Sequence, residues 1–290
     1  MMDSANRIKV TAHASERGTW RMAFLAPAAP MAPFVRQCNA YAEHNTEFLR
    51  RRELPSGLAV LVFNLGHELR VEHPHETQTA FAVGSAFYSG PSATYAVTET
   101  DGAQQGAQVM LTLSGARRLL GRPLGDIGDR LTDPADLLGA ATAREITGLL
   151  MEAQSQAHRL AILEQAMASR FAPGPAAPRD LEWAWTRLQS SAGRVRIGAL
   201  AAELGCSRKH LTVRFHHEFG IPPKLLARIL RFDRAMRLLT QEPLSGWADL
   251  AAACGYADQA HLAREFHDFT GSPPAAFLRS RLPDNGGFTD

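Results

Sequence analysis

The chain has 290 residues, of which 45% are hydrophobic, and its formal net charge is +2 at pH 7. This length suggests two domains, and the apolar content excludes an intrinsically disordered chain. Residues 179–282 hold 15 Lys and Arg against 10 Asp and Glu, whereas the rest of the chain holds 16 against 19. A basic C-terminal part joined to a mildly acidic N-terminal part fits a protein that binds a polyanion through one domain.

Three cysteines are present, Cys38, Cys206 and Cys254, at wide spacing. They exclude a zinc ribbon or a Cys-x-x-Cys redox motif, and they suit a reducing cytoplasm. The first 18 residues are polar and lack the apolar core of a secretory signal, and the longest apolar run is too short to span a membrane. We therefore expect a cytoplasmic, nucleoid-associated protein with no membrane partner.

Residues 20–113 are expected to be rich in β-strands. The apolar run 58–63 is closed by Asn64-Leu65-Gly66, which is typical of a buried strand. Further short strand candidates, separated by turn-forming residues, cover residues 69–72, 79–83, 94–98 and 109–113. Short strands at this spacing predict a small barrel or sandwich.

From residue 114 the pattern becomes helical. A short helix over 116–120 is stopped by Gly121, and Asp133-Pro134 can supply the N-cap and first residue of the next helix. Residues 140–153 and 157–171 have the apolar spacing of amphipathic helices. The Pro-, Gly- and Ala-rich segment that follows predicts an extended linker.

Beyond the linker, one pattern occurs twice. Each copy reads as an apolar-faced helix, a tight turn containing Gly205 or Gly255, and a second helix stopped by Gly and Pro. This order of elements is typical of a helix-turn-helix, whose second helix enters the major groove of DNA. Asp180 can cap a helix that precedes the first copy. Between the copies, the apolar residues of segment 224–239 share one face and predict a long helix that packs against both units.

The second copy carries the most specific motif, Gly255-Tyr-Ala-Asp-Gln-Ala-His-Leu-Ala-Arg-Glu-Phe266, followed by Gly271-Ser-Pro-Pro274. Together with the first copy, it resembles the DNA-binding domain of the AraC/XylS family of bacterial transcriptional regulators. More weakly, the segment Arg52-Glu-Leu-Pro-Ser-Gly57 before a strand resembles the sensor-side domains of such regulators. The resemblance implies a DNA-binding transcription factor with a separate N-terminal domain.

The predicted fold is α+β, with a β-rich N-terminal domain that ends in helices and an all-α C-terminal domain of two helix-turn-helix units joined by a long helix. The expected boundaries are residues 1–171 for a sensor or dimerisation domain, 172–179 for the linker, 180–282 for the DNA-binding domain and 283–290 for a mobile tail. Two recognition helices would then lie about 34 Å apart, one turn of DNA.

Within each recognition helix, one apolar pair at i and i+4 should face the core: Leu211 with Phe215, and Leu262 with Phe266. The residues expected to contact DNA are Arg208, Lys209, Thr212, Arg214, Gln259, His261 and Arg264. Arg264 can read guanine and Gln259 adenine, whereas Arg208 and Arg214 suit phosphate. The resemblance implies groove contacts at Lys209, Thr212, Gln259 and Arg264.

The first unit departs from the family pattern, because Val213 stands where the second has Arg264. Arg214, the next residue, points about 100° away around the helix. Val213 is instead suited to a thymine methyl group. Ser207 and Asp258 are expected to cap the two recognition helices.

The expected partners are double-stranded DNA at promoter sites and RNA polymerase, with a small-molecule effector and a homodimer as further candidates. We expect no cofactor and no enzymatic activity. The alternative is a bifunctional protein with a cupin-like or DNA-repair activity in the N-terminal part, although Cys38 lacks the sequence context of a repair nucleophile. A DNA-binding protein without sequence preference is disfavoured by the base-reading side chains Gln259 and Arg264.

Three other features of the N-terminal part are expected to be structural and to have no binding or catalytic role. His67, His73 and His75, with Glu68 and Glu76, suggest a metal site, but a polar hairpin is preferred because the expected further Glu is missing. The run Arg50-Arg51-Arg52 is expected to be solvated. The N-terminal aromatic residues are expected to be mostly core, although some are candidates for a ligand pocket: Trp20, Phe24, Phe63, Phe81, Phe87 and Tyr88.

Overall fold

The computed structural model describes residues 7–16, 18–45, 49–74, 77–171, 176–241 and 246–280, together with Phe288. The N-terminal elements are β1 Ile8–Ser15, β2 Gly18–Leu25, a 3-10 turn Ala29–Met31, β3 Val35–Asn45, β4 Leu49–Glu53, β5 Leu58–Asn64, β6 Leu69–Glu72, β7 Thr79–Phe81, β8 Ala86–Ser89, β9 Ala96–Thr100, β10 Ala103–Thr112, α2 Leu113–Leu120, α3 Pro134–Leu138, α4 Ala140–Glu152 and α5 Gln156–Phe171. The C-terminal helices are α6 Arg179–Ser190, α7 Ile197–Glu203, α8 Arg208–Phe219, α9 Pro223–Gln241, α10 Trp247–Cys254, α11 Gln259–Thr270 and α12 Pro274–Arg279.

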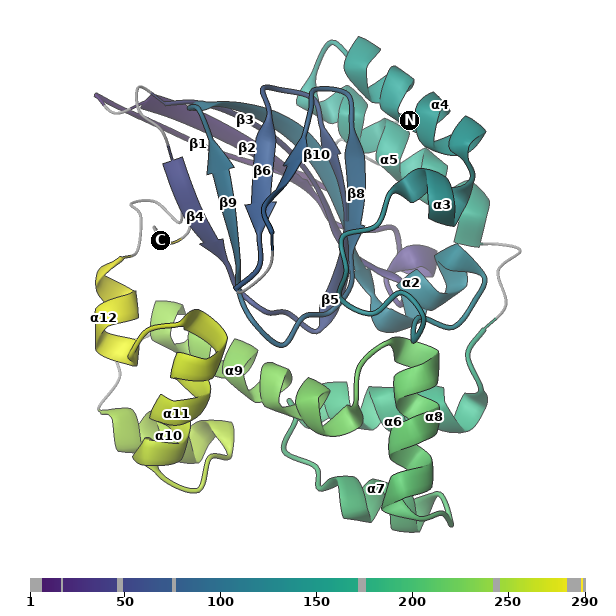
Figure 1. The fold of residues 1–290 in the computed structure, drawn as a ribbon, viewed down its shortest axis with the longest axis vertical. Helices are drawn as coiled ribbons and strands as arrows, with labels where there is room; N and C mark the ends of the chain where they lie inside the picture. Colours follow the sequence, from purple (N-terminus) through teal and green to yellow (C-terminus); the bar gives the residue numbers. More distant parts are fainter. Residues whose placement is uncertain are drawn as a thin grey trace.

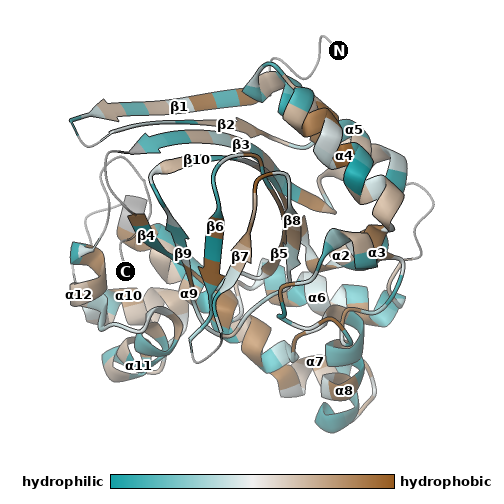
Figure 2. Ribbon diagram, turned by 45° about the horizontal axis from the view of Figure 1, so that its top comes forward, coloured by the Kyte–Doolittle hydropathy of each residue, from teal (hydrophilic) through white to brown (hydrophobic). Residues whose placement is uncertain are grey.

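The strands form two antiparallel sheets that curve around a common interior (Figure 1). One sheet has the order β1-β2-β3-β10-β5-β8 and the other β4-β9-β6-β7. Because side chains alternate along a strand, each strand has one interior and one exterior face, and Figure 2 shows this alternation of hydropathy along β1 and β2. The α+β fold is as predicted from the sequence.

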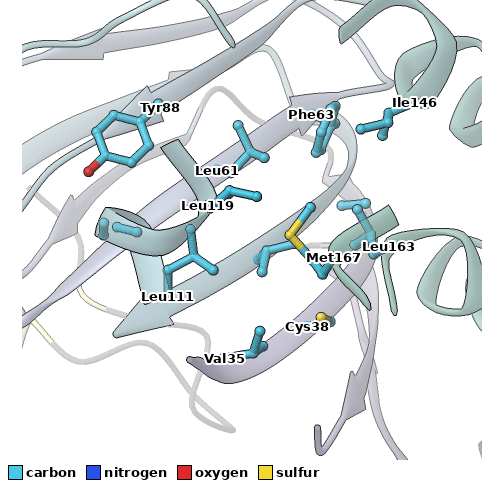
Figure 3. Packing of buried hydrophobic residues seen from close by; sticks show 14 of the residues in the cluster. Val35, Cys38, Leu61, Phe63, Tyr88, Leu111, Leu119, Ile146, Leu163 and Met167 are labelled. Carbon is cyan, nitrogen blue, oxygen red and sulfur yellow. The ribbon is translucent and has the colours of Figure 1, made fainter. Parts of the chain in front are cut away.

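Helices α2, α4 and α5 cover the outer face of the larger sheet. Figure 3 shows strand residues such as Cys38 and Leu111 facing Leu119, Leu163 and Met167 of α2 and α5 in one apolar cluster. These side chains are 9% exposed or less, so this cluster forms the main core of the N-terminal part.

The sequence located only some of the strands. β5 and β6 lie where predicted, and β7 begins at the predicted residue but ends two residues earlier. The candidates 94–98 and 109–113 differ from β9 and β10 by two or more residues at one end or both, and no candidate was given for β1, β2, β3, β4 or β8. In β3, the interior face presents Gln37, Tyr41 and Glu43, and the outer face presents small residues such as Ala40. A polar interior removes the apolar alternation by which a strand is usually identified.

The helices agree more closely with the predictions. α4 and α5 begin and end within one residue of the predicted segments, and Gly121 ends α2 in a left-handed conformation. Asp133 caps α3 by accepting from the Ala135 amide at 2.8 Å. In the C-terminal part, α9 is the predicted long helix and contacts both α8 and α11 (Figure 1).

Two expectations at the domain ends differ from the structure. The N-cap position of α6 is Pro178, and Asp180 lies inside the first turn, where its carboxylate pairs with Arg214. Of the predicted linker, only residues 176–179 are described; Ala177 is buried against the C-terminal core, and Arg179 is already helical. In the predicted mobile tail, Phe288 is described and stacks on Phe277 with ring centroids 4.1 Å apart.

Candidate DNA-binding interface

Both recognition helices, α8 and α11, have well-defined ends. The Ser207 hydroxyl accepts a hydrogen bond from the His210 amide at 3.1 Å, and the Asp258 carboxylate accepts one from the His261 amide at 2.6 Å. These are the predicted N-caps, and each satisfies one of the free amides of a helix start. The remaining amides of each first turn are available to a phosphate.

The predicted inward sides of both helices are confirmed. Leu211, Phe215, Leu262 and Phe266 are at most 1% exposed. The Phe266 ring packs edge-on against Phe232 of α9, with centroids 5.3 Å apart. The apolar side of each helix therefore fixes its rotation and determines which residues remain exposed.

Four predicted contact residues project from this scaffold. Arg208, Lys209, Gln259 and Arg264 are exposed, and none has a side-chain hydrogen bond or ion pair within the described part of the chain. Val213, beside them on α8, is 61% exposed, which is unusual for a β-branched apolar residue. The exposed side of α8 thus combines cations with an apolar patch, and that of α11 combines an amide with a guanidinium.

Two other predicted residues are partly engaged within the protein. Thr212 is half-buried, and its hydroxyl donates to the Arg208 carbonyl at 2.8 Å. The half-buried His261 ring packs edge-on against Tyr256, and its Nε2 lies 3.5 Å from Glu265 Oε1. These contacts orient both side chains at the protein surface.

Arg214 differs from the free, phosphate-binding cation that the sequence suggests. Its two terminal nitrogens donate to the two Asp180 oxygens at 2.5 and 3.1 Å, in a bidentate pair between α8 and α6. Hydrogen bonds from Arg214 hold the pKa of Asp180 below its usual value. The pair ties the first recognition helix to the helix that precedes its unit.

The second unit contains the same tie with the charges exchanged. Glu265 of α11 accepts from Arg228 Nε at 2.8 Å and from Arg231 at 3.3 Å, both on α9. Arg231 and Glu265 are 34 residues apart, as are Asp180 and Arg214. The two ion pairs therefore occupy equivalent positions of the repeat with opposite polarity, and that of the second unit is more buried, because Glu265 is only 5% exposed.

The C-terminal end of α8 is held by the N-terminal part of the chain. Arg117 of α2 forms a buried ion pair with Glu218, and the Gly125 amide donates to the His217 carbonyl at 2.9 Å. The helix ends at Gly220, whose φ of +73° favours glycine, and a Cβ there would lie 3.0 Å from the Leu124 carbonyl oxygen.

The C-terminal end of α11 is held in the same way. Arg52 of β4 donates to the Thr270 carbonyl at 2.5 Å and to the Ser272 hydroxyl at 2.7 Å. The equivalent glycine, Gly271, has φ +70°, and a Cβ there would lie 2.7 Å from the Tyr95 ring. Both recognition helices thus contact the N-terminal part at their C-terminal ends and expose their N-terminal ends.

Sequence reasoning missed these contacts, and it interpreted the arginine run in β4 as solvated. Arg50 lies 2.5 Å from Glu99, Arg51 lies 2.7 Å from Glu43, and Arg52 contacts α11. The one sequence feature that pointed to this region was the weak resemblance of segment 52–57 to the sensor-side domains of AraC/XylS regulators. That resemblance assigned no role to the segment.

Two described members of the histidine cluster, His67 and Glu68, have other partners. His67 contacts Asp101 at 2.8 Å, and Glu68 pairs with Arg70, while His73 is buried. His75 and Glu76 lie outside the described residues. Within the described residues, no group of three His, Cys, Asp or Glu side chains is placed to hold a metal ion.

A cavity of about 890 Å³ lies between the two sheets. Its apolar lining includes three of the candidate aromatic residues, Trp20, Phe24 and Phe87, whereas Phe63 and Tyr88 are buried in the core instead. Lys9 and Arg36 also line the cavity and are exposed, and Arg36 lies close enough to Asp233 of α9 to interact with its carboxylate. The cavity thus combines an apolar wall with cations at its surface.

Comparisons with known proteins place residues 200–280 under a family model described as a helix-turn-helix domain. Among solved structures, the chain is similar to ToxT from Vibrio cholerae, at 13% identity over 94% of this chain and 98% of that chain, with a TM-score of 0.47. It is also similar to the C-terminal domain of AraT, a response regulator from Geobacillus stearothermophilus, at 23% identity over 39% and 93% of the two chains, with a TM-score of 0.34. No curated protein matches the sequence. Within the described residues, no helix is long and apolar enough to cross a membrane.

Proposed function

We propose that this DNA-binding transcription regulator, whose residues 200–280 form an AraC-type helix-turn-helix domain, reads promoter sequences by placing α8 and α11 in two successive major grooves. One observation carries the proposal. Both helices bury their apolar sides against a shared scaffold and leave base-reading or phosphate-binding side chains exposed at their N-terminal halves. Recognition helices of this class contact base edges with those residues.

The exposed side chains suggest that the two recognition helices make different kinds of contact with DNA. Arg264 suits the two acceptors of guanine, and Gln259 suits adenine, so α11 would carry most of the hydrogen-bonded readout. On α8, Lys209 and Arg208 would contact phosphates, and Val213 would contact a thymine methyl group. The first unit would therefore select bases more weakly than the second.

The N-terminal part would modulate this binding through the contacts at the ends of both helices. Arg117 of α2 contacts α8, and Arg52 of β4 contacts α11. A shift of β4 relative to α2 would therefore change the relative placement of the two recognition helices. A small-molecule effector in the cavity would be the source of such a shift, and Lys9 and Arg36 suit an effector that carries an anionic group. RNA polymerase and a second copy of the chain remain proposed partners in the cytoplasm.

A DNA-repair activity that uses a cysteine nucleophile is disfavoured, because Cys38 is the one cysteine of the N-terminal part. Burial raises the pKa of Cys38 to about 12, so the thiolate that a nucleophile requires is scarce at neutral pH. We propose that the protein acts by binding alone.

The spacing of the two half-sites tests the proposal. A duplex carrying both preferred sequence blocks should bind full-length protein tightly, and inserting five base pairs between the blocks should weaken binding at least ten-fold, because the second block rotates to the opposite face of DNA. Insertion of ten base pairs returns the second block to the same face of the DNA as the first but leaves it one helical turn too far away, so it should also weaken binding. Equal affinity for all three duplexes would contradict a two-groove reader.

A further inference from the structure

The segment between α6 and α7, residues 191–196, lies between the starts of the two recognition helices. On one side, the Arg194 side chain covers Gly255 in the turn that leads to α11; a Cβ on this glycine would lie 2.9 Å from Arg194 Cγ. On the other side, Gly198 in the first turn of α7 lies against Arg208, the first residue of α8, with a Cβ position 3.5 Å from Arg208 Cδ. The segment therefore bridges the two surfaces that face DNA in the proposed function.

The segment has a fixed conformation. The Ser191 hydroxyl accepts from the Val195 amide at 3.2 Å, and the Ser191 carbonyl accepts from Arg194 Nε at 3.1 Å. The Gly193 carbonyl accepts from Arg231 at 3.0 Å, and Arg231 is the same residue that holds α11 through Glu265. The segment is thus tied to the scaffold of the second unit and moves with it.

Two cations project from this segment. Arg194 and Arg196 are both exposed. Arg196 has no side-chain hydrogen bond or ion pair within the described residues. Within the same residues the Arg194 side chain donates through Nε alone, so its two terminal nitrogens remain available as donors. No carboxylate of the described residues pairs with either side chain. The terminal nitrogens of both guanidinium groups are therefore not engaged in ion pairs within the described part of the chain.

On B-DNA, two successive major-groove segments on one face of the duplex are separated by the minor groove and the phosphates that flank it. A segment located between two recognition helices faces this part of the duplex. We propose that Arg194 and Arg196 contact the sugar–phosphate backbone across the central minor groove, forming a third DNA contact that neither recognition helix supplies. This inference rests on the proposed two-groove binding and adds the contact that spans the two half-sites.

Such contacts add affinity without base selection. Each phosphate that a cation neutralises contributes about 0.9 to the slope of log affinity against log salt concentration. Loss of both arginines should therefore lower the slope by about two units and leave the preferred bases unchanged.

The experiment measures the affinity of full-length protein for a duplex with both blocks, over a series of salt concentrations. The variants are Arg196→Gln, which removes no side-chain hydrogen bond or ion pair of the described residues, and Arg194→Gln with Arg196→Gln together. Arg144→Gln is the matched control, because it removes an equally exposed arginine from α4, on the other side of the molecule (Figure 1). Hydroxyl-radical footprinting, which reports on the minor groove, is performed on the same duplex.

The inference predicts a slope lower by about one unit for Arg196→Gln and about two for the double variant, with loss of protection between the blocks and unchanged protection within them. A slope equal to that of the wild type and of Arg144→Gln would overturn it, as would unchanged central protection. If the wild-type protein fails to distinguish the two-block duplex from a one-block duplex, the proposed function fails instead, so the two failures are distinguishable.

Discussion

Arg264 is the residue on which base selection depends most in this account, because its guanidinium is exposed and has no partner within the described residues. Replacement by Ala should cost about 1–3 kcal/mol of binding free energy at the preferred site and relax selection at one base pair. Competitive binding to duplexes that differ at single positions measures both effects. A uniform loss across all duplexes would instead assign Arg264 to phosphate.

Asp180 and Arg214 should contribute to stability and not to DNA affinity. Because Arg214 lowers the pKa of Asp180 in the folded state, the pair stabilises the protein at pH values above the unfolded pKa, and this stabilisation is lost as pH falls through the folded value. Asp180→Asn should therefore lower the free energy of unfolding by about 1 kcal/mol or less at pH 7, since both side chains are 37% exposed, and by nothing at low pH.

Denaturant unfolding of the wild type and Asp180→Asn at pH 7 and pH 3 measures this difference. Lys209→Ala serves as the contrast, because it should leave stability unchanged and lower the salt slope of DNA binding by about one. The prediction fails if Asp180→Asn and the wild type differ equally at both pH values.

The residue scale also shows where sequence reasoning was sufficient. The buried pairs of α8 and α11 and the caps Ser207 and Asp258 were predicted because each depends on residues within one or two helical turns. The partner of Arg214 was not predicted, because Asp180 lies 34 residues earlier and leaves no local pattern.

At the scale of elements, the two recognition helices are tied to α6 and α9 by ion pairs of opposite polarity. Glu265 is more buried than Asp180. Glu265→Gln removes the carboxylate that Arg228 and Arg231 share, and among the described residues only Arg228 keeps a second ion pair, with Asp268. We expect it to cost about 3 kcal/mol of unfolding free energy, well above the cost of Asp180→Asn. Thermal and denaturant unfolding of the two variants side by side measures the ranking, and equal costs would contradict it.

Helices were easier to predict than strands for a physical reason. Helices α8, α10 and α11 each end at a glycine and bury a single apolar side, and both features are local. β1 and β3 line a cavity, so their interior faces carry residues such as Lys9, Thr11 and Gln37, and the periodicity of a buried strand is lost.

At the scale of the whole molecule, the N-terminal part holds the equivalent C-terminal ends of both recognition helices. Arg52→Gln removes the hydrogen bonds to Thr270 and Ser272, so the second unit would have to be ordered when DNA binds. Affinity for a two-block duplex should fall about five-fold or more, with affinity for the α8 block alone unchanged. Binding titrations with the two duplexes measure this.

Arg50→Gln is the control for this prediction, because Arg50 lies on the same strand and pairs with Glu72 and Glu99. A loss of equal size in both variants, or none in Arg52→Gln, would contradict the role of the contact. No sequence pattern predicts this link, since Arg52 and Thr270 are 218 residues apart.

Selection of bound sequences from random duplex DNA, with the full-length protein at physiological salt, tests the central claim most directly. Two helices in successive major grooves predict enrichment of a motif with two short blocks about ten base pairs apart, of which the α11 block is the more strongly conserved among the selected sequences. Enrichment of one block alone, or weak salt-sensitive binding with no enriched motif, would contradict the account.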